Sequence, residues 1–135
     1  MKNDELVRLA HEAKQKAYAP YSNFRVGAAL ITESGKLFMG SNIENASFGA
    51  TNCAERTAVF KAVSEGEHSI KSIAIASESE DYIYPCGICR QVLSEFGQKD
   101  TKIICSNKKG DYTVFTLDEM LPNAFVKSGG KLNEL

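Results

Sequence analysis

The sequence predicts an α/β sandwich built on a mixed sheet of about five strands. Segments with helical spacing alternate with short apolar segments of strand length, a pattern typical of sheets covered by helices. Two expected strands are separated only by the turn at residues 33–36, so they form an antiparallel hairpin. Strands joined through helices are expected to make another part of the sheet parallel. The 135 residues show no internal repeat or linker and predict a single domain, 1–135.

The first helix is expected over residues 4–18, where apolar side chains recur at near-helical spacing. Asn3 or Asp4 can cap its start, and the helix cannot continue through Pro20. The strands of the hairpin follow at residues 25–32 and 37–41.

A second helix is expected at residues 53–64, followed by a short buried strand at residues 69–77. The third helix is expected at residues 86–96. Pro85 is suited to its first turn and Gly97 to its end.

Two more strands are expected at residues 102–106 and 112–115, on either side of a polar turn. A short terminal helix is expected at residues 116–122. Thr116 can cap it, because Glu119 lies three residues later and completes a capping box.

Charge and composition indicate which partners to expect. Lys and Arg number 16 and Asp and Glu 17, so the chain has no excess of positive charge. No nucleic-acid partner is therefore expected. The first residues are charged and no apolar run approaches the roughly 20 residues that cross a bilayer, so no membrane association is expected. We therefore expect a cytoplasmic protein with a small-molecule substrate. In that reducing compartment, four cysteines favour metal binding or catalysis over disulfides.

Three of the cysteines lie in two short motifs, CAER at 53–56 and PCGICR at 85–90. Both motifs fall at expected helix N-termini, where unpaired backbone N–H groups favour thiolates. Cys86 and Cys89 are one helical turn apart, and Cys53 supplies a third sulfur. Three thiolates leave the fourth tetrahedral position of zinc open, as catalytic sites require. The sequence therefore predicts a catalytic site with one Zn²⁺ per subunit.

Charged residues beside the cysteines fit such a site. Glu55 lies two residues after Cys53 and can carry protons. Three thiolates give the zinc site a net negative charge, which opposes the ionisation of a bound water. Arg56 and Arg90 each follow a cysteine and can donate hydrogen bonds to sulfur, a role that we assign first to Arg56.

Two other interpretations of the cysteines stay open. A structural zinc site in a binding module would take Cys105 as its fourth ligand, although Cys105 lies in an apolar strand and can be a small buried hydrophobe. Cys86 and Cys89 alone could instead form a redox pair. The two histidines, His11 and His68, lie far from both motifs in sequence and are expected on the surface.

Three cysteines and a glutamate in this arrangement match the pattern of zinc deaminases. The chain resembles the cytidine deaminase family, in its small homotetrameric form. Five segments in one order carry the resemblance: 18–30 (YAPYSNFRVGAAL), 41–46 (SNIENA), 53–58 (CAERTA), 85–91 (PCGICRQ) and 121–125 (LPNAF). The resemblance implies a three-layer α/β/α fold and hydrolytic deamination of cytidine and 2′-deoxycytidine to uridine and 2′-deoxyuridine, with release of ammonia. It also implies active sites at subunit interfaces.

The resemblance implies a role for individual residues. The three cysteines would bind zinc, and Glu55 would transfer protons. Asn42 and Glu44, two apart on a strand, would project to the same side and bind the 3′ hydroxyl of the ribose. The remaining substrate contacts would come from the ring of Phe24, the backbone of Ala54 and, from a neighbouring subunit, Phe125.

Two positions depart from the family pattern. Phe48 stands where a tyrosine is familiar, so a hydroxyl that could reach the 5′ end of the nucleoside is missing. Ile88 stands where alanine is familiar and is expected to alter packing around the cysteines. Another aminopyrimidine, such as an antibiotic nucleoside resembling blasticidin, is the rival substrate. Cytosine in a polynucleotide is disfavoured, because the chain has no basic tract or interleaved aromatic residues.

Overall fold

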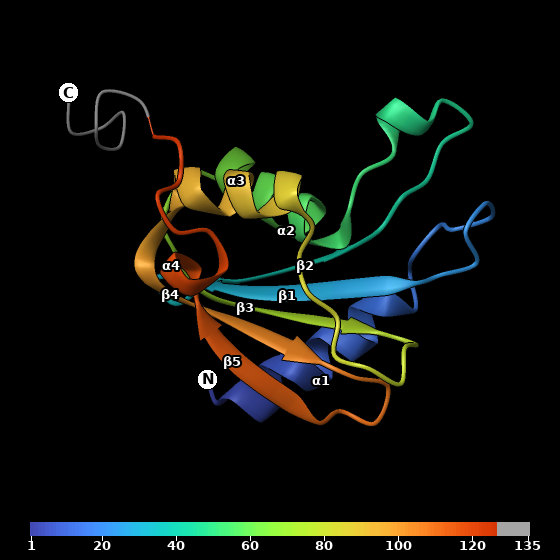
Figure 1. Cartoon of the computed structure of the whole chain (residues 1–135), viewed down its shortest axis with the longest axis horizontal. Coiled ribbons are helices and arrows are strands. Elements are labelled where there is room, and N and C mark those ends of the chain that lie inside the picture. Colours follow the sequence, from blue (N-terminus) through green and yellow to red (C-terminus); the bar gives the residue numbers. More distant parts are fainter. Residues whose placement is uncertain (127–135) are drawn as a thin grey trace.

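A mixed five-stranded sheet lies at the centre of the computed structural model, which describes residues 1–126 (Figure 1). This confirms the predicted α/β class and strand number. The strands are β1 (Val26–Thr32), β2 (Leu37–Ser41), β3 (Ile70–Ser77), β4 (Gly97–Ser106) and β5 (Tyr112–Thr116).

The order of the strands in the sheet is β2-β1-β3-β4-β5. The pair β3 and β4 is parallel, while β1 pairs antiparallel with both β2 and β3, and β5 pairs antiparallel with β4. It follows that β2, β3 and β4 run in the same direction. The helix that connects β2 to β3 and the helix that connects β3 to β4 therefore both begin at the same edge of the sheet.

Helices cover both faces of this sheet, which gives the three layers that we expected. The helices are α1 (Asn3–Lys14), α2 (Ala54–Ser64), α3 (Gly87–Phe96) and α4 (Leu117–Met120), and a short 3₁₀ helix η1 spans Phe48–Ala50. Figure 1 shows α1 on one face and α2 and α3 on the other. None of the helices described within residues 1–126 is long and apolar enough to cross a membrane.

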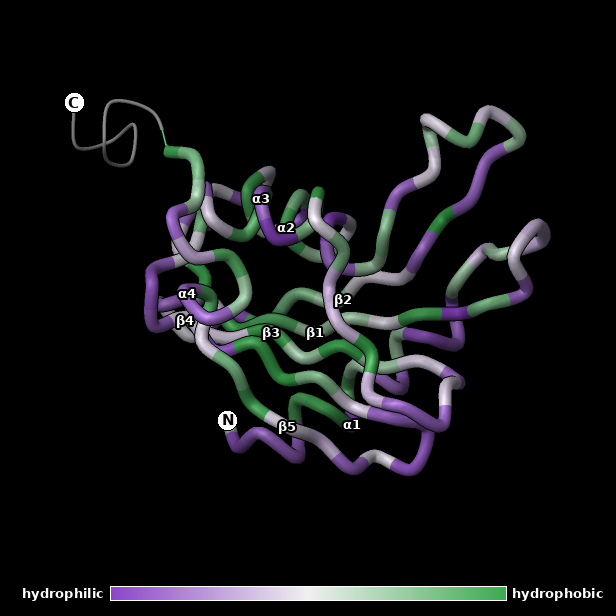
Figure 2. Tube along the Cα trace, in the orientation of Figure 1, coloured by the Kyte–Doolittle hydropathy of each residue, from purple (hydrophilic) through white to green (hydrophobic). Residues whose placement is uncertain are grey.

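Two apolar clusters hold the layers together. The larger one packs α2, α3 and α4 against one face of the sheet, through side chains such as Val59, Leu93 and Ile103. The smaller one packs α1 against the other face, through Leu6 and Ile104 among others. Figure 2 shows the apolar residues concentrated along the central strands, with polar residues towards the outer turns. Burial of both faces explains why residues 73–76 of β3 are all apolar rather than alternating.

The first helix ends four residues earlier than we predicted. Its last residue is Lys14, because the backbone of Tyr18 is used elsewhere: the Tyr18 N–H donates to the Asn42 carbonyl at 2.9 Å. Its start was also wrong, since Lys2 is the N-cap residue and makes no side-chain capping bond among the described residues. The expected capping box of α4, between Thr116 and Glu119, is confirmed.

Three further expectations need correction. Cys86 is the N-cap residue of α3, so Pro85 precedes the helix instead of lying in its first turn. Strand β4 begins directly at Gly97, five residues before the predicted start. His11 is half-buried against Lys14, and burial, followed by the charge of Lys14, lowers its pKa. His68 is exposed, as expected.

Replacement of Gly27 by alanine should destabilise the fold strongly. A Cβ atom at Gly27 would lie 2.0 Å from the carbonyl oxygen of Ala10, so α1 could no longer approach β1. We expect a loss of about 3 kcal/mol in the free energy of unfolding, measured by urea denaturation. Gly49→Ala is the matched control, because among described residues nothing lies within 4 Å of the added atom. Equal stability of the two variants would contradict this account of the packing.

Two loops, 18–25 and 43–52, project from one end of the sheet (Figure 1). A β-bridge between Tyr18 and Ile43 joins them, and a second bridge, between Ile43 and Asn52, joins the two ends of loop 43–52. The rings of Tyr21 and Phe48 also meet edge to face, with centroids 5.8 Å apart. The two loops thus form one structure, and its last bridge lies next to Cys53.

Candidate metal centre

The topology of the sheet brings the three cysteines together. Cys53 is the N-cap residue of α2 and Cys86 is the N-cap residue of α3, while Cys89 lies in the first turn of α3. Both helices begin at the same edge of the sheet, so their N-termini face each other. Neither N-cap sulfur makes a capping bond among the described residues, which leaves both available as ligands.

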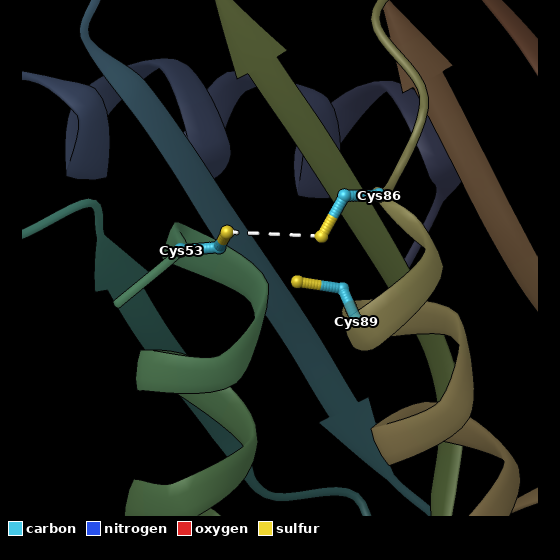
Figure 3. Close-up of side chains that lie close together, drawn as sticks. All are labelled: Cys53, Cys86 and Cys89. Atoms are coloured by element: carbon cyan, nitrogen blue, oxygen red, sulfur yellow. Dashed lines mark hydrogen bonds between the residues drawn. The ribbon is translucent and has the colours of Figure 1, made fainter. Parts of the chain in front are cut away.

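The geometry of the sulfur atoms suits zinc. The Sγ atoms of Cys53, Cys86 and Cys89 all lie within 4.8 Å of one another, and those of Cys53 and Cys86 are 3.9 Å apart. Zn–S bonds of about 2.3 Å in a tetrahedron place sulfur atoms about 3.8 Å apart. Figure 3 shows the three side chains pointing towards a common centre from α2 and α3. Since none of the four cysteines is in a disulfide, all three thiols can act as ligands.

The ionisation of these thiols also fits a cation. Hydrogen bonding from Cys89 and from the Arg56 guanidinium lowers the pKa of Cys53 to about 5. The pKa of Cys89 is raised, because it donates to Cys53 and because it is buried. The first thiolate therefore forms easily, and its negative charge opposes ionisation of the next thiol. A bound dication would allow all three to ionise, so the donor set fits Zn²⁺.

Glu55 lies beside the sulfur atoms and is almost fully buried, with 5% of its surface exposed. Burial and, to a smaller extent, the negative charge of Cys53 raise the pKa of its carboxyl to about 7. A carboxyl with this pKa exchanges protons near neutral pH, which is what proton transfer to and from a substrate requires.

Arg56 and Arg90 differ in the role that the structure gives them. Arg56 donates from Nη2 to the sulfur of Cys53 at 3.3 Å, as we predicted. Arg90 instead donates to the backbone carbonyls of Pro85 and Met120, at 2.8 Å each, and so ties α3 to α4. Of the two arginines that could donate to sulfur, Arg56 therefore has this role and Arg90 has a different one. Its planar guanidinium is used to fix the loop that carries Cys86.

Replacement of Arg56 by glutamine should weaken the metal site. The variant loses the positive charge beside Cys53 and keeps the length of the side chain. We expect zinc affinity or turnover to fall about 10- to 100-fold, measured by competition with a chelator and by steady-state kinetics. The exposed Arg8→Gln change is the control. Unchanged zinc affinity together with unchanged turnover in the Arg56 variant would show that its hydrogen bond has no such role.

Cys105 does not join the cluster. It is fully buried in β4, and burial raises the pKa of its thiol to about 12. Among the described residues, the group of possible metal ligands consists of the other three cysteines. The structure therefore gives no support to a four-cysteine structural site that includes Cys105.

Asn42 and Glu44 follow the end of β2 and do not lie within it. The side chain of Asn42 binds the backbone at the end of loop 18–25: Oδ1 accepts from the Val26 N–H at 2.8 Å, and Nδ2 donates to the Phe24 carbonyl at 2.9 Å. The Glu44 carboxylate accepts from residues 21 and 22 of the same loop. Each side chain retains capacity for a further hydrogen bond. Sequence patterns did not indicate these protein partners.

The other residues singled out from the sequence differ in their exposure. Ala54 is fully buried at the start of α2, while Phe24 stays partly exposed on loop 18–25. Phe125 exposes 77% of its surface, although its backbone carbonyl accepts a hydrogen bond from Gln91 on α3. Ile88 is 62% exposed, and its effect on packing around the cysteines stays a prediction. Phe48 is exposed at the tip of loop 43–52.

The fold, the three-thiol cluster and the buried glutamate define the chain as a zinc-binding deaminase of the α/β/α class. A family model described as the zinc-binding region of cytidine and deoxycytidylate deaminases matches residues 1–105. The chain belongs to the cytidine deaminase family.

Relatives support this at the level of sequence and structure. A cytidine deaminase from Halalkalibacterium halodurans is 48% identical, over 93% of this chain and 95% of the relative. One from Sporosarcina psychrophila is 46% identical, over 92% and 91%. The crystal structure of the cytidine deaminase from Burkholderia pseudomallei superposes with a TM-score of 0.89, at 47% identity, over 93% of this chain and all of the other.

Proposed function

We propose that this chain is a zinc-dependent hydrolase that converts cytidine and 2′-deoxycytidine to uridine and 2′-deoxyuridine, with release of ammonia. The observation that carries the proposal is the convergence of three thiols from two helix N-termini beside a buried carboxyl with a pKa of about 7. A structural metal site has no need for such a carboxyl. Family membership identifies the class of substrate.

Cys53, Cys86 and Cys89 would hold one Zn²⁺ per subunit. When bound, zinc supplies a Lewis acid that makes a hydroxide equivalent available from water near neutral pH. The guanidinium of Arg56 donates to the Cys53 sulfur and reduces the negative charge of the ligand set.

Glu55 would move the protons of the reaction. Its carboxylate accepts a proton from the attacking water and delivers it to N3 of the pyrimidine as the new C–O bond forms at C4. Glu55 then takes the proton of the new hydroxyl at C4 and transfers it to the departing amine, so that ammonia leaves, a carbonyl forms at C4 and Glu55 returns to its starting state. Its burial keeps bulk water away from these transfers.

The substrate would bind between the metal centre and loop 18–25. Asn42 and Glu44 would bind the ribose 3′ hydroxyl with the capacity that their protein contacts leave free. Phe24 would pack against the pyrimidine, and the backbone of Ala54 would bind the ring carbonyl. The bridge between Ile43 and Asn52 connects the sugar-binding segment to the residue before Cys53, which supports a single continuous site.

The protein is further proposed to assemble as a homotetramer with active sites at subunit interfaces. The support from the structure is exposed aromatic surface, in particular Phe125 and the tip of loop 43–52 at Phe48. Phe125 would then complete a neighbour's site. Light scattering coupled to size exclusion should give four chains per particle, and dilution into monomers should abolish turnover. Active monomers would contradict the shared site.

The cytoplasm is the proposed location. Thiols that must stay reduced to bind zinc fit a reducing compartment better than an oxidising one. Cell fractionation with the protein in a membrane or secreted fraction would contradict this.

The loss of ultraviolet absorbance on deamination tests the proposed substrate. We expect turnover of cytidine and 2′-deoxycytidine, and turnover of a blasticidin-type nucleoside or of cytosine in a single-stranded oligonucleotide at least about a hundredfold slower. Faster turnover of the blasticidin-type nucleoside or of the oligonucleotide than of cytidine would identify that compound as the substrate instead. No reaction with cytidine would refute the proposal.

A further inference from the structure

The backbone of Phe24 is held at both of its polar groups. Its N–H donates to the hydroxyl of Ser22 at 3.0 Å, and its carbonyl accepts from Nδ2 of Asn42 at 2.9 Å. A residue on an exposed loop normally gives these groups to water. Here the position of the aromatic ring depends on Ser22 and Asn42.

Ser22 is also bound to Glu44. Its hydroxyl donates to Oε2, and its backbone N–H donates to Oε1 at 3.0 Å, where the Tyr21 N–H also donates at 2.9 Å. These bonds lower the pKa of the Glu44 carboxyl, and those from Ser22 have the largest effect. The carboxyl therefore stays ionised at neutral pH. One serine oxygen therefore connects the carboxylate of the sugar site to the backbone of the residue at the base site.

The loop has a defined shape around this serine. Asn23 adopts a left-handed conformation with φ 55°, which asparagine tolerates better than most residues. Its N–H donates to the Ala19 carbonyl at 3.0 Å, which closes the turn. Ser22 is consequently fixed between Glu44 and Phe24 by the turn as well as by its own bonds.

We propose that Ser22 is a positioning residue that couples the sugar site to the base site, an inference that rests on the proposed function. Without its hydroxyl, Phe24 loses the acceptor for its N–H, and Oε2 of Glu44 loses its protein partner. Both groups could then adopt positions unsuited to the nucleoside, so substrate binding would have to order them. Ser22 is not placed at the reacting atoms, so its loss should weaken binding of the substrate in the ground state and in the transition state equally.

Steady-state kinetics with cytidine test the inference on four proteins: wild type, Ser22→Ala, Ser22→Thr and Ser79→Ala. Ser22→Ala should raise KM about tenfold and leave kcat within about twofold, as expected for loss of uniform binding. Ser22→Thr keeps a hydroxyl and should stay within about threefold of wild type. Ser79→Ala is the matched control, because Ser79 Oγ accepts the N–H of Asp81 at 3.1 Å, the same local bond outside the site.

Two further measurements separate positioning from a general structural effect. The dissociation constant of the product, uridine, should rise about tenfold in Ser22→Ala. This binding measurement does not depend on turnover. In a Phe24→Ala background, Ser22→Ala should raise KM by less than about threefold, because the ring it positions is absent. Ser22 is exposed, so its truncation leaves no cavity and the variant should fold.

An active wild type with an unchanged KM in Ser22→Ala would overturn the inference and leave the proposed function standing. A fall in kcat equal to the loss in kcat/KM, or a Ser22→Thr variant as impaired as Ser22→Ala, would also overturn it. A wild type that contains zinc and does not deaminate cytidine would refute the proposed function, and the inference with it.

Discussion

Replacement of Glu55 by glutamine should reduce turnover of cytidine more than about a thousandfold while zinc content and fold are preserved. Glutamine has nearly the shape of glutamate and fits the same buried position, but it cannot accept and return a proton. Glu55 is not one of the three sulfur ligands, so metal binding should persist. The measurements are kcat from the ultraviolet assay and zinc per chain from elemental analysis.

Glu65→Gln provides the control for this change. Glu65 is the exposed C-cap residue of the same helix, α2, and the substitution alters the same functional group far from the sulfur atoms. It should behave as wild type. A Glu55→Gln variant that keeps near-native kcat would remove Glu55 from the proton transfers and would require another base.

Replacement of Cys89 by alanine should remove the metal and the activity together. Cys89 is a buried member of the sulfur cluster, and two remaining thiols bind zinc far more weakly than three. We expect less than about a tenth of the wild-type zinc content and a loss of turnover of more than about a thousandfold. Elemental analysis after gel filtration and the cytidine assay measure the two effects.

Cys105→Ala distinguishes this from the general cost of losing a buried cysteine. Cys105 is as buried as Cys89 and lies outside the sulfur cluster. Its truncation should cost about 1–2 kcal/mol in the free energy of unfolding and leave zinc content unchanged. If the Cys105 variant lost zinc as well, the interpretation as a four-ligand structural site would return.

The elements near the metal centre could be predicted because local chemistry defines them. Cys53 and Cys86 lie at helix N-termini, and Thr116 with Glu119 forms a capping box; both features depend on residues within a few positions. The order of the strands could not be predicted, since it depends on packing between segments far apart in the chain. That order is what makes α2 and α3 begin at the same edge.

The errors in the prediction have the same origin. Residues 15–18 continue the helical pattern of α1, but a bridge to Ile43 takes the backbone of Tyr18. Residues 97–101 are mostly polar and have no strand pattern, yet Gly97 pairs with Ile70 across a register shift. Ser22 was missed because its partner Glu44 is 22 residues away. No periodicity connects such positions.

Zinc removal and restoration on the wild-type protein tests the central claim most directly. The cytidine assay and elemental analysis are run on the protein as isolated, after treatment with a strong chelator, and after addition of Zn²⁺. We predict about one zinc per chain, loss of turnover in parallel with loss of zinc, and recovery of both on addition of the metal. Full cytidine turnover by protein shown to be free of zinc would contradict the account.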